Sequence, residues 1–386
     1  MDSIPRKSPG PVRILHLIST LDIGGAEQNL FRLTTSMDRN AFENHVVCMT
    51  RPGILGHTLE QSGIRVSSLN MKKGMPDLRA VLRLRFMASL IKPDIIQCWM
   101  YHANLLGLTL LNPKRTLWNI RCSDMDLSVY GPIYRFTVKA GATFSQTPSV
   151  VIANSYAGRD VHEELGYRPK RWAIITNGFN TYTFKPNTDA RVKIRTELKI
   201  PQEAFVIGLV CRCDPMKDHA TFFKAAEAFL QSCPGGHFIL AGRGVSWAYP
   251  SLENYLPYSL DKTSFHLLGE RSDTDKIFTS LDIATSSSAW GEGLPNAIGE
   301  AMSTGIPCVV TDVGDSAVLV GDAGIVVPKK NPQALCAAWQ HLLNAGSDYR
   351  KNLGISARQR IIDHYSLTSM VQAYEELYKN IITIQN

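Results

Sequence analysis

The chain has 386 residues, of which 44% are hydrophobic and 19% charged, a composition typical of a soluble protein long enough for two domains with full cores. Its longest strongly apolar run, residues 103–111, is much shorter than the ~20 residues of a membrane-spanning helix, and its polar start predicts no secretory signal peptide. The net charge of +7 is uneven, because residues 1–178 hold 22 Lys and Arg against 13 Asp and Glu, whereas the remainder holds 19 against 21.

The first half of the chain alternates short apolar runs, typical of buried strands, with longer stretches of helical periodicity. Strands are predicted at residues 13–18, 45–49, 65–69, 95–98, 117–120, 150–154 and 173–175. Helices are predicted at residues 26–36, 77–92 and 156–165. Alternation of this kind builds a parallel sheet that is covered by helices on both faces.

The second half repeats this scheme. Strands are predicted at residues 206–209, 237–241, 265–267, 283–285 and 307–311, and helices at 219–232, 273–281, 295–303 and 367–382. Ser366 is a good cap for the last helix, and Ser272 with Asp275 resembles a capping pair for the second. We therefore expect an α/β protein of two Rossmann-like domains, residues 1–178 and 179–366, with a ligand cleft at the carboxyl ends of the strands.

The segment from Gly291 to Ser303 is the most informative part of the sequence. Glu292 and Glu300 stand in Gly-Glu-Gly-Leu-Pro-Asn-Ala-Ile-Gly-Glu, directly after a predicted buried strand. Pro295 suits the first turn of a helix, so the order is strand, glycine turn, helix. A helix start offers backbone N–H groups, here those of Gly293 and Leu294, to a phosphate. Two carboxylates beside such a site favour a ligand that also carries hydroxyls, as a nucleotide-sugar does.

Two other loops carry groups suited to an anionic ligand. Gly24-Gly25 follows the first strand, where a glycine pair permits close approach of backbone to a ligand, although alone it also fits an ordinary turn. Arg212 and Lys217 follow the first strand of the second half. A guanidinium grips phosphate oxygens in pairs and an ammonium acts as a point charge, so together they can neutralise a leaving diphosphate without a metal.

These motifs resemble retaining GT-B glycosyltransferases of glycosyltransferase family 4. The matching segments are spread in order over nearly the whole chain: Gly24-Gly25-Ala26-Glu27, Arg212-x4-Lys217, Glu292-x7-Glu300 and Thr311-Asp312-Val313-Gly314. The family pattern often has glycine after the lysine, where Asp218 stands here. The resemblance implies the GT-B fold, in which two Rossmann-like domains face each other across a cleft and the last helix, residues 367–386, returns to the first domain.

The resemblance also implies roles for single residues. It assigns the transferred sugar to Glu292, the donor ribose to Glu300, and the diphosphate to the Gly24-Gly25 loop, with Gly25 in closest approach. His102, followed by Ala-Asn as in the family, is expected on the acceptor side near the transferred sugar. The loop with Arg271 is expected at the nucleobase, mainly through its backbone. The expected catalytic residues are therefore Glu292, His102, Arg212 and Lys217.

We expect neither a metal nor another cofactor. The segments 124–126 and 273–275 match Asp-x-Asp, the metal-binding signature of GT-A glycosyltransferases, but so short a pattern often arises by chance. In addition, acidic residues at a helix start, as in the second segment, favour the helix dipole. The eight cysteines lack the paired spacing of a zinc site and are expected as reduced cytosolic thiols.

The basic excess of the first half points to an anionic partner on that side. No nucleic-acid motif is present, so an anionic membrane surface or a phosphate-bearing acceptor is the alternative. Arg79, Arg83 and Arg85 lie among apolar residues in segment 72–92, as in helices that lie on membranes, although a sheet-covering helix with a basic edge has the same pattern. We expect a peripheral protein at the cytoplasmic face of a membrane.

The function expected from the resemblance is transfer of a hexose-type sugar from a nucleotide-sugar, most simply a UDP-sugar, to a hydroxyl of a lipid-linked glycan in surface polysaccharide or glycoconjugate biosynthesis. Two alternatives remain at this stage. One is a nucleotide-sugar epimerase of the same fold, and the other is an inactive partner subunit that only binds a nucleotide-sugar. The intact basic pair and both glutamates favour the transferase.

Overall fold

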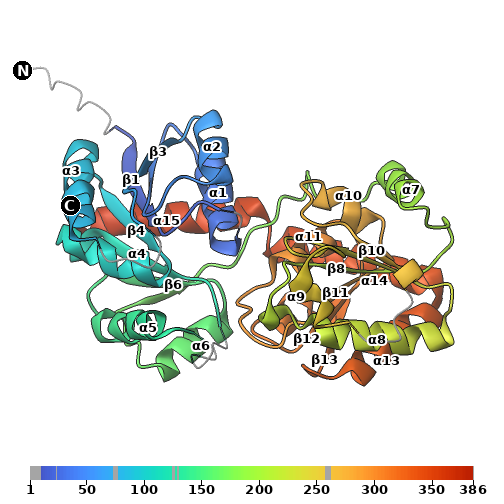
Figure 1. The fold of residues 1–386 in the computed structure, drawn as a ribbon. Helices are drawn as coiled ribbons and strands as arrows, with labels where there is room; N and C mark the ends of the chain where they lie inside the picture. The colour runs from blue at the N-terminus through green and yellow to red at the C-terminus, as the bar shows by residue number, and fades with distance from the viewer. Residues whose placement is uncertain are drawn as a thin grey trace, which may run out of the picture.

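The computed structural model describes residues 10–22, 24–72, 77–123, 127, 130–256 and 262–385. The segment Asp124-Met125-Asp126 therefore lies outside the described residues, as do residues 73–76 of the predicted basic segment. The chain forms two α/β halves side by side, joined by a linker and by the C-terminal helices (Figure 1).

The first half is built on a seven-stranded parallel sheet of order β3-β2-β1-β4-β5-β6-β7. Its strands are β1 (Val12–Ile18), β2 (Phe42–Cys48), β3 (Arg65–Ser68), β4 (Ile95–Trp99), β5 (Thr116–Ile120), β6 (Val150–Ala153) and β7 (Trp172–Ile174). Because side chains alternate along a strand, Ile14 and Ile18 of β1 pack on one face of this sheet and Leu15 and Leu17 on the other.

Helices cover both faces of the first sheet. One face packs against α1 (Gly25–Ser36), α2 (Ile54–Gln61) and α15 (Leu367–Gln385), and the opposite face against α3 (Leu78–Ile91), α4 (Met100–Gly107) and α5 (Pro132–Phe144). Helix α6 (Tyr156–Glu164) lies beside β6 and β7. The predicted parallel sheet with two covered faces is confirmed.

The second half is a six-stranded parallel sheet of order β10-β9-β8-β11-β12-β13. The strands are β8 (Val206–Val210), β9 (His237–Ala241), β10 (Phe265–Leu267), β11 (Ile283–Ser286), β12 (Cys308–Thr311) and β13 (Gly324–Val327). Helices α8 (His219–Ser232) and α13 (Pro332–Asn344) cover one face, and α10 (Thr274–Thr279), α11 (Asn296–Ser303) and α14 (Gly346–His364) cover the other.

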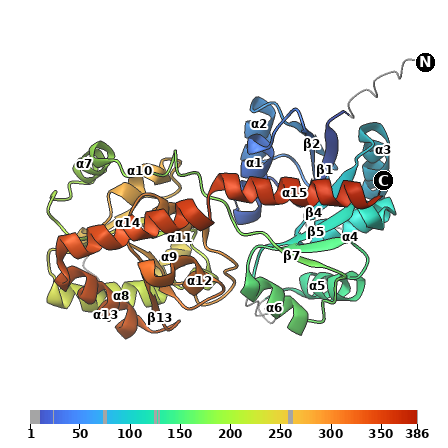
Figure 2. The same cartoon turned by 180° about the vertical axis from the view of Figure 1, so that it is seen from behind.

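The chain crosses between the halves twice, at neighbouring positions. Phe179 donates its N–H to Tyr365 O at 2.9 Å, and Leu367 donates to Phe179 O at 2.9 Å. After this second crossing, α15 runs along the back of the first sheet (Figure 2), where Tyr374 and Tyr378 are fully buried. The domain boundary at residue 178 stays a prediction, since β7 ends at Ile174 and β8 begins at Val206.

Some local predictions differ from the structure. Pro295 is the N-cap of α11, with φ −72° and ψ 114°, so the helix begins one residue later than predicted. The predicted capping pair of Ser272 and Asp275 is wrong, because the N-cap of α10 is Asp273, whose carboxylate binds Arg271. The cap at Ser366 is confirmed by the Ser369 N–H, which donates to its hydroxyl at 3.1 Å.

The helices and strands that the sequence did not predict are α2, α4, α5, β13, α13, α14, α7 (Thr188–Glu197), α9 (Pro250–Glu253) and α12 (Ser316–Val320).

Candidate active site

A cavity of about 700 Å³ lies between the two halves at the carboxyl ends of their strands. Open α/β sheets bind ligands at this edge. The segments that line the cavity follow strands of both sheets, namely β1, β4, β5, β6 and β7 in the first half and β8, β9, β10 and β11 in the second. Nine of the site residues predicted from the sequence line this cavity: Gly24, Gly25, Arg212, Lys217, Arg271, Glu292, Gly293, Leu294 and Pro295.

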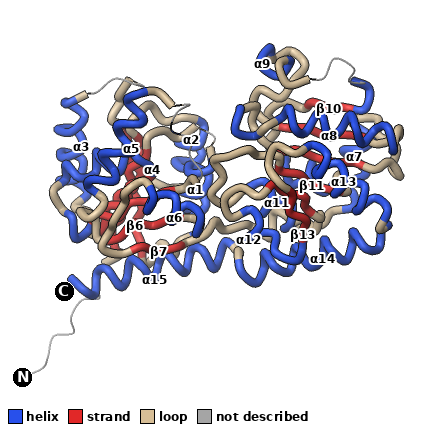
Figure 3. The backbone as a smooth tube through the Cα atoms, turned by 90° about the horizontal axis from the view of Figure 1, so that it is seen from below, coloured by secondary structure: helices blue, strands red, loops and turns tan. Residues whose placement is uncertain are grey.

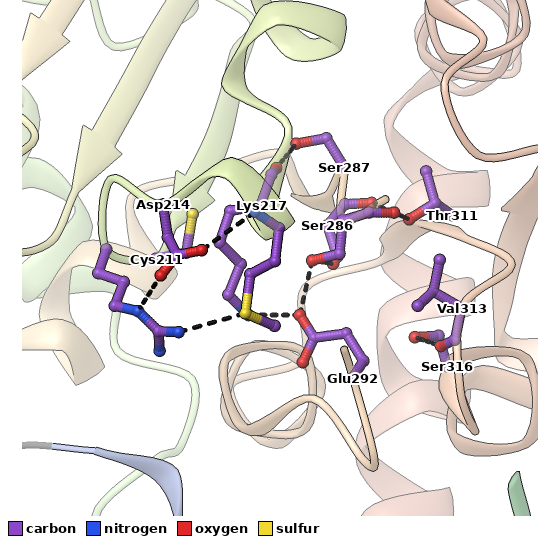
Figure 4. Close-up of polar contacts among 12 residues, drawn as sticks. Cys211, Asp214, Lys217, Ser286, Ser287, Glu292, Thr311, Val313 and Ser316 are labelled. Atoms are coloured by element: carbon purple, nitrogen blue, oxygen red, sulfur yellow. Dashed lines mark hydrogen bonds and ion pairs between the residues drawn. The ribbon is translucent and has the colours of Figure 1, made fainter. Parts of the chain in front are cut away.

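Glu292 and Lys217 form an ion pair at the centre of the second half's edge (Figure 4). Their side chains are only 9% and 16% exposed, and the Ser288 hydroxyl donates to the same carboxylate oxygen at 2.6 Å. Burial alone would raise the pKa of Glu292, but the charge and hydrogen bond of Lys217, with that of Ser288, hold the pKa below its ordinary value. The cavity therefore holds a fixed carboxylate and a fixed ammonium in contact.

The backbone of residues 292–294 is oriented from both halves. Ser123 donates its hydroxyl to Glu292 O, Asp315 donates its N–H to Gly293 O at 2.9 Å, and the Asn177 amide donates to Leu294 O at 2.8 Å. Because the N–H of a trans peptide points opposite to its C=O, the N–H groups of Gly293 and Leu294 point away from these partners. They remain at the cavity lining, where an anion can accept from them.

Two helix starts meet at this cavity. Helix α1 begins at Gly25 and α11 at Asn296, and a Cβ on Gly25 would lie 3.5 Å from Nδ2 of Asn296. A side chain on Gly293 would collide with Asn154 of the first half, within 2.5 Å. Glycine at position 293 thus allows the halves to approach, whereas a Cβ at position 25 would make only an ordinary van der Waals contact. Both helix dipoles present their positive ends to the same space, which favours an anionic ligand.

The two arginines predicted for the site are both paired with acids. Arg212 donates to Asp214 at 2.9 Å and to the sulfur of Met216 at 3.2 Å. Arg271 is held by Asp273 and Glu197, each at 2.8 Å, and these hydrogen bonds raise its pKa above the ordinary value. Arg212 is 43% exposed and lines the cavity, so its guanidinium can reach a ligand there.

Glu300 and His102 are the two predicted residues that are absent from the described cavity lining. Glu300 has a side chain that is 13% exposed and pairs with Arg32 of α1 in the first half, and Arg32 also donates to Gly178 O at 3.3 Å. Burial nevertheless raises the pKa of Glu300 more than Arg32 lowers it. His102 lies exposed on α4, with its ring 5.9 Å from that of Tyr134, which does line the cavity. The roles predicted for both residues stay predictions.

Sequence reasoning missed several polar residues of the first half that line the cavity. Arg121 follows β5 and donates to the Asn177 amide oxygen, while its guanidinium lies 5.5 Å from the ring centroid of Trp99. Burial lowers the pKa of Arg121. Glu27 stands in the first turn of α1, and burial raises its pKa, partly offset by Arg212 and Arg121. The signal for Arg121 was its place directly after a buried strand.

In the ranges that the structure describes, no three His, Cys, Asp or Glu side chains lie close enough together to hold a metal ion. Asp273, from the second Asp-x-Asp segment, has both carboxylate oxygens bonded to Arg271.

Comparison with known proteins gives two family matches. The model described as Glycosyltransferase Family 4 matches residues 23–182, and the model described as Glycosyl transferases group 1 matches residues 204–345. Between them the two matches cover most of both halves, including the glycine loop, the basic pair and the two glutamates.

Curated relatives match over part of their length. The chain is 28% identical over 233 residues to an Escherichia coli UDP-Gal:alpha-D-GlcNAc-diphosphoundecaprenol alpha-1,3-galactosyltransferase, which covers 57% of each protein. It is 28% identical over 246 residues to a D-inositol 3-phosphate glycosyltransferase of Corynebacterium urealyticum, covering 61% of this chain and 57% of the relative. The chain thus matches little more than half the length of these relatives.

Solved structures match over almost the whole chain. Anabaena Alr3699/HepE in complex with UDP superposes with a TM-score of 0.82 at 20% identity, over 96% of this chain and 100% of that one. The same protein in complex with UDP-glucose gives a TM-score of 0.80 at 22% identity, over 95% and 99%. These likenesses establish the fold. The two family matches, which together span most of the chain, show that this GT-B protein belongs to the glycosyltransferases of glycosyltransferase family 4.

Proposed function

We propose that this protein transfers a hexose-type sugar from a UDP-sugar to a hydroxyl of a lipid-linked glycan, with retention of configuration and without a metal. The observation that carries the proposal is the buried pair of Glu292 and Lys217, which lies beside Arg212 and two helix starts in one cavity. This arrangement offers cations to a diphosphate and a carboxylate to sugar hydroxyls at adjacent points.

The diphosphate would lie against the positive groups of the cavity. Lys217 and Arg212 would take its oxygens, together with the N–H groups of Gly293 and Leu294 and the Gly24-Gly25 loop. Cations placed where the leaving group gains charge stabilise the transition state. The support is that these groups come from three separate loops and line the same space.

The sugar would lie between Glu292 and the first half. The lowered pKa of Glu292 keeps its carboxylate ionised, so it can accept hydrogen bonds from sugar hydroxyls. Glu300 would hold the ribose and His102 would contact the acceptor side. Lys217 already neutralises Glu292, which argues against a nucleophilic role for this carboxylate. Attack of the acceptor from the same face as the departing phosphate, which then takes the acceptor's proton, is the retaining route we propose.

A lipid-linked acceptor is supported by the Escherichia coli relative, whose name specifies a diphosphoundecaprenol acceptor. It is also supported by the basic excess of residues 1–178, the half on the acceptor side of a GT-B fold. Among the described residues, no helix is long and apolar enough to cross a membrane. We propose that the protein acts at the cytoplasmic face, where such acceptors would meet a nucleotide-sugar.

Thermal shift across a panel of nucleotide-sugars tests the donor. A ligand at ~100 times its Kd stabilises the native state by ~2.7 kcal/mol, which raises Tm by about 5–10 °C for a domain of ~150–250 residues. We expect the largest shift with UDP-sugars, and a much smaller shift in Arg212→Gln.

Lys224→Gln is the matched control, since Lys224 lies exposed on α8. Its shift should equal that of the wild type. Absence of a shift with every nucleotide-sugar, or a full shift in Arg212→Gln, would contradict the proposed donor site.

A further inference from the structure

Asp315 of the second half reaches a helix of the first half. It stands at the N-cap of α12, but its carboxylate makes no capping bond to that helix. Instead, the N–H of Tyr156 donates to one of its carboxylate oxygens at 2.7 Å, and the N–H of Ala157 donates to the other at 2.9 Å. Both donors begin α6, which lies beside α12 where the two halves meet (Figure 3). Asp315 is only 3% exposed, so this link between the halves is shielded from water.

The two bonds complete the hydrogen bonding at the start of α6. The first N–H groups of a helix have no partner within it, and a negative charge at this end also interacts favourably with the helix dipole. Ser155, the N-cap of α6, accepts from the N–H of Gly158 at 3.0 Å. The N–H groups of Tyr156 and Ala157 are left to Asp315. If the halves separated, these two N–H groups and the carboxylate would have to bind water instead.

Asp315 is also bonded to the segment that we assign to the donor diphosphate, residues 292–294, which we call the donor loop. The N–H of Asp315 donates to Gly293 O at 2.9 Å, and this carbonyl belongs to the same peptide as the N–H of Leu294. Because the peptide is planar, the bond fixes the direction of that N–H. Gly314 permits the contact, since its φ is +57° and a Cβ there would collide with Glu292 O.

The other end of the link lies at the cavity as well. Asn154, two residues before Tyr156, lines the cavity, and a Cβ on Gly293 would collide with its side-chain amide. Asp315 itself is absent from the described lining. It therefore connects the donor loop, through its backbone, to the cavity edge of the first half, through its carboxylate.

We propose that Asp315 is a positioning residue for sugar transfer, which holds α6 and the acceptor side of the cavity in a fixed place relative to the donor loop. The kinetic role rests on the proposed function, whereas the link between the halves does not. A misplacement of ~1 Å can slow a reaction about 100-fold. The cations that we assign to the diphosphate, Lys217 and Arg212, both belong to the second half. Loss of the link should therefore lower kcat much more than it weakens donor binding.

Two substitutions break the link from opposite sides. Asp315→Asn removes the charge and one of the two acceptor oxygens. Tyr156→Pro removes a donor N–H, and proline is favoured at the first position of a helix. It would follow Ser155, whose ψ of 153° suits a residue before proline.

Each substitution has a matched control. Tyr156→Ala removes the same ring, which is 52% exposed, but keeps the N–H. Asp322→Asn removes a carboxylate at an exposed position that follows α12.

Amide hydrogen exchange without any ligand tests the link. In the wild type the N–H of Ala157 is bonded to Asp315. In Asp315→Asn we expect this N–H to exchange at least about tenfold faster, because a broken hydrogen bond opens the amide to water. Exchange in Asp322→Asn should equal that of the wild type.

Cleavage of a UDP-sugar by water tests the kinetic role without requiring a known acceptor. The probe is UDP-glucose or UDP-galactose, whichever the wild type cleaves faster, and the product measured is UDP. We expect Asp315→Asn and Tyr156→Pro each to lower kcat about 10- to 100-fold. The donor KM and the Kd of UDP should stay within about threefold of the wild type.

The double variant and the controls complete the kinetic test. Asp315→Asn/Tyr156→Pro should be no slower than the slower single variant, because both substitutions break the same link. Tyr156→Ala and Asp322→Asn should retain the kcat of the wild type.

Unchanged exchange at Ala157 in Asp315→Asn would overturn the link itself. A wild-type kcat in Asp315→Asn or in Tyr156→Pro would overturn the positioning role, as would equal losses of kcat and UDP affinity. A wild type that binds no UDP and cleaves neither UDP-sugar would instead contradict the proposed function, and the exchange at Ala157 would still decide the link.

Discussion

Replacing Lys217 by methionine should destabilise the second half, because it leaves the Glu292 carboxylate buried without its cation. Both side chains are nearly inaccessible, at 16% and 9% exposed. Breaking such a pair from one side costs about 3–5 kcal/mol, whereas replacing both partners with neutral groups of similar size is often close to neutral. The prediction is therefore a large loss in Lys217→Met and recovery in Lys217→Met/Glu292→Gln.

The expected size can be measured as a melting temperature. For a domain of ~150–250 residues, 1 kcal/mol corresponds to about 2–4 °C, so Lys217→Met should lower Tm by roughly 6–20 °C. The double variant should melt within a few degrees of the wild type but remain inactive. Lys224→Met, at an exposed position, should change stability by less than about 0.5 kcal/mol.

The pH dependence of stability should distinguish the single variant further. In the wild type the pKa of Glu292 is lowered from its ordinary 4.5, so its contribution is present above that value and is lost as pH falls through the lowered pKa. In Lys217→Met burial should raise this pKa instead, so that protonation on acidification relieves the penalty. The difference in Tm should shrink as pH falls from 7. Equal Tm at pH 7, or parallel pH profiles, would refute this account of the pair.

Three other outcomes are expected. Arg212→Ala should lower kcat about 100-fold, as removal of one transition-state contact does, whereas Glu300→Ala should mainly raise the donor KM; equal small effects in steady-state kinetics would contradict these roles. Activity should survive EDTA, and loss with recovery on added manganese would support an Asp-x-Asp metal site. The free energy of unfolding should fall as the pH is lowered from 6.5 to about 4. Burial lowers the pKa values of His16, His162 and His219 to about 4, so between these two pH values the unfolded chain binds more protons than the folded chain. Thermal melts across this range check it, and a flat profile would contradict it.

The parts of the site that could be predicted are the loops that directly follow a strand. Glu292, Gly293 and Leu294 follow β11, and Arg212 and Lys217 follow β8, the neighbouring strand. Parallel strands bring their carboxyl ends to one edge, so residues directly after them converge whatever the separation in sequence. This rule was sufficient for most of the predicted site residues that line the cavity.

Contacts between the halves could not be predicted in the same way. Arg32 and Glu300 are 268 residues apart, and their pairing depends on how α1 and α11 meet across the cavity. The same holds for Ser123, which donates to Glu292 O. No local pattern encodes these contacts, because they follow from the relative placement of two separately folded sheets.

Helix α3 shows a further limit of sequence patterns. Its apolar residues form two rows, one with Ala80 and Leu84 and the other with Leu78, Leu82 and Phe86. The sequence predicted an amphipathic basic helix, but either row satisfies the requirement for a sheet-facing side. The choice is made by the sheet, where small Ala80 permits close packing and Leu84 fills the core. The larger exposed row then becomes visible only in the structure.

The ion pair of Glu292 and Lys217 also bears on how a donor could enter this cavity. A buried ammonium and a buried carboxylate are each costly alone, and in this structure Lys217 and Glu292 are paired with each other. On the proposed function, a diphosphate reaching Lys217 would supply a new anion, while sugar hydroxyls would supply hydrogen bonds to Glu292. Both charges would then exchange one partner for another without being left unpaired. A nucleoside diphosphate that lacks the transferred sugar would supply an anion to Lys217 but no hydroxyl to Glu292, which would keep only its hydrogen bond from Ser288. The pair therefore favours ligands that carry phosphate and sugar together, which is the selectivity that a glycosyl donor site requires.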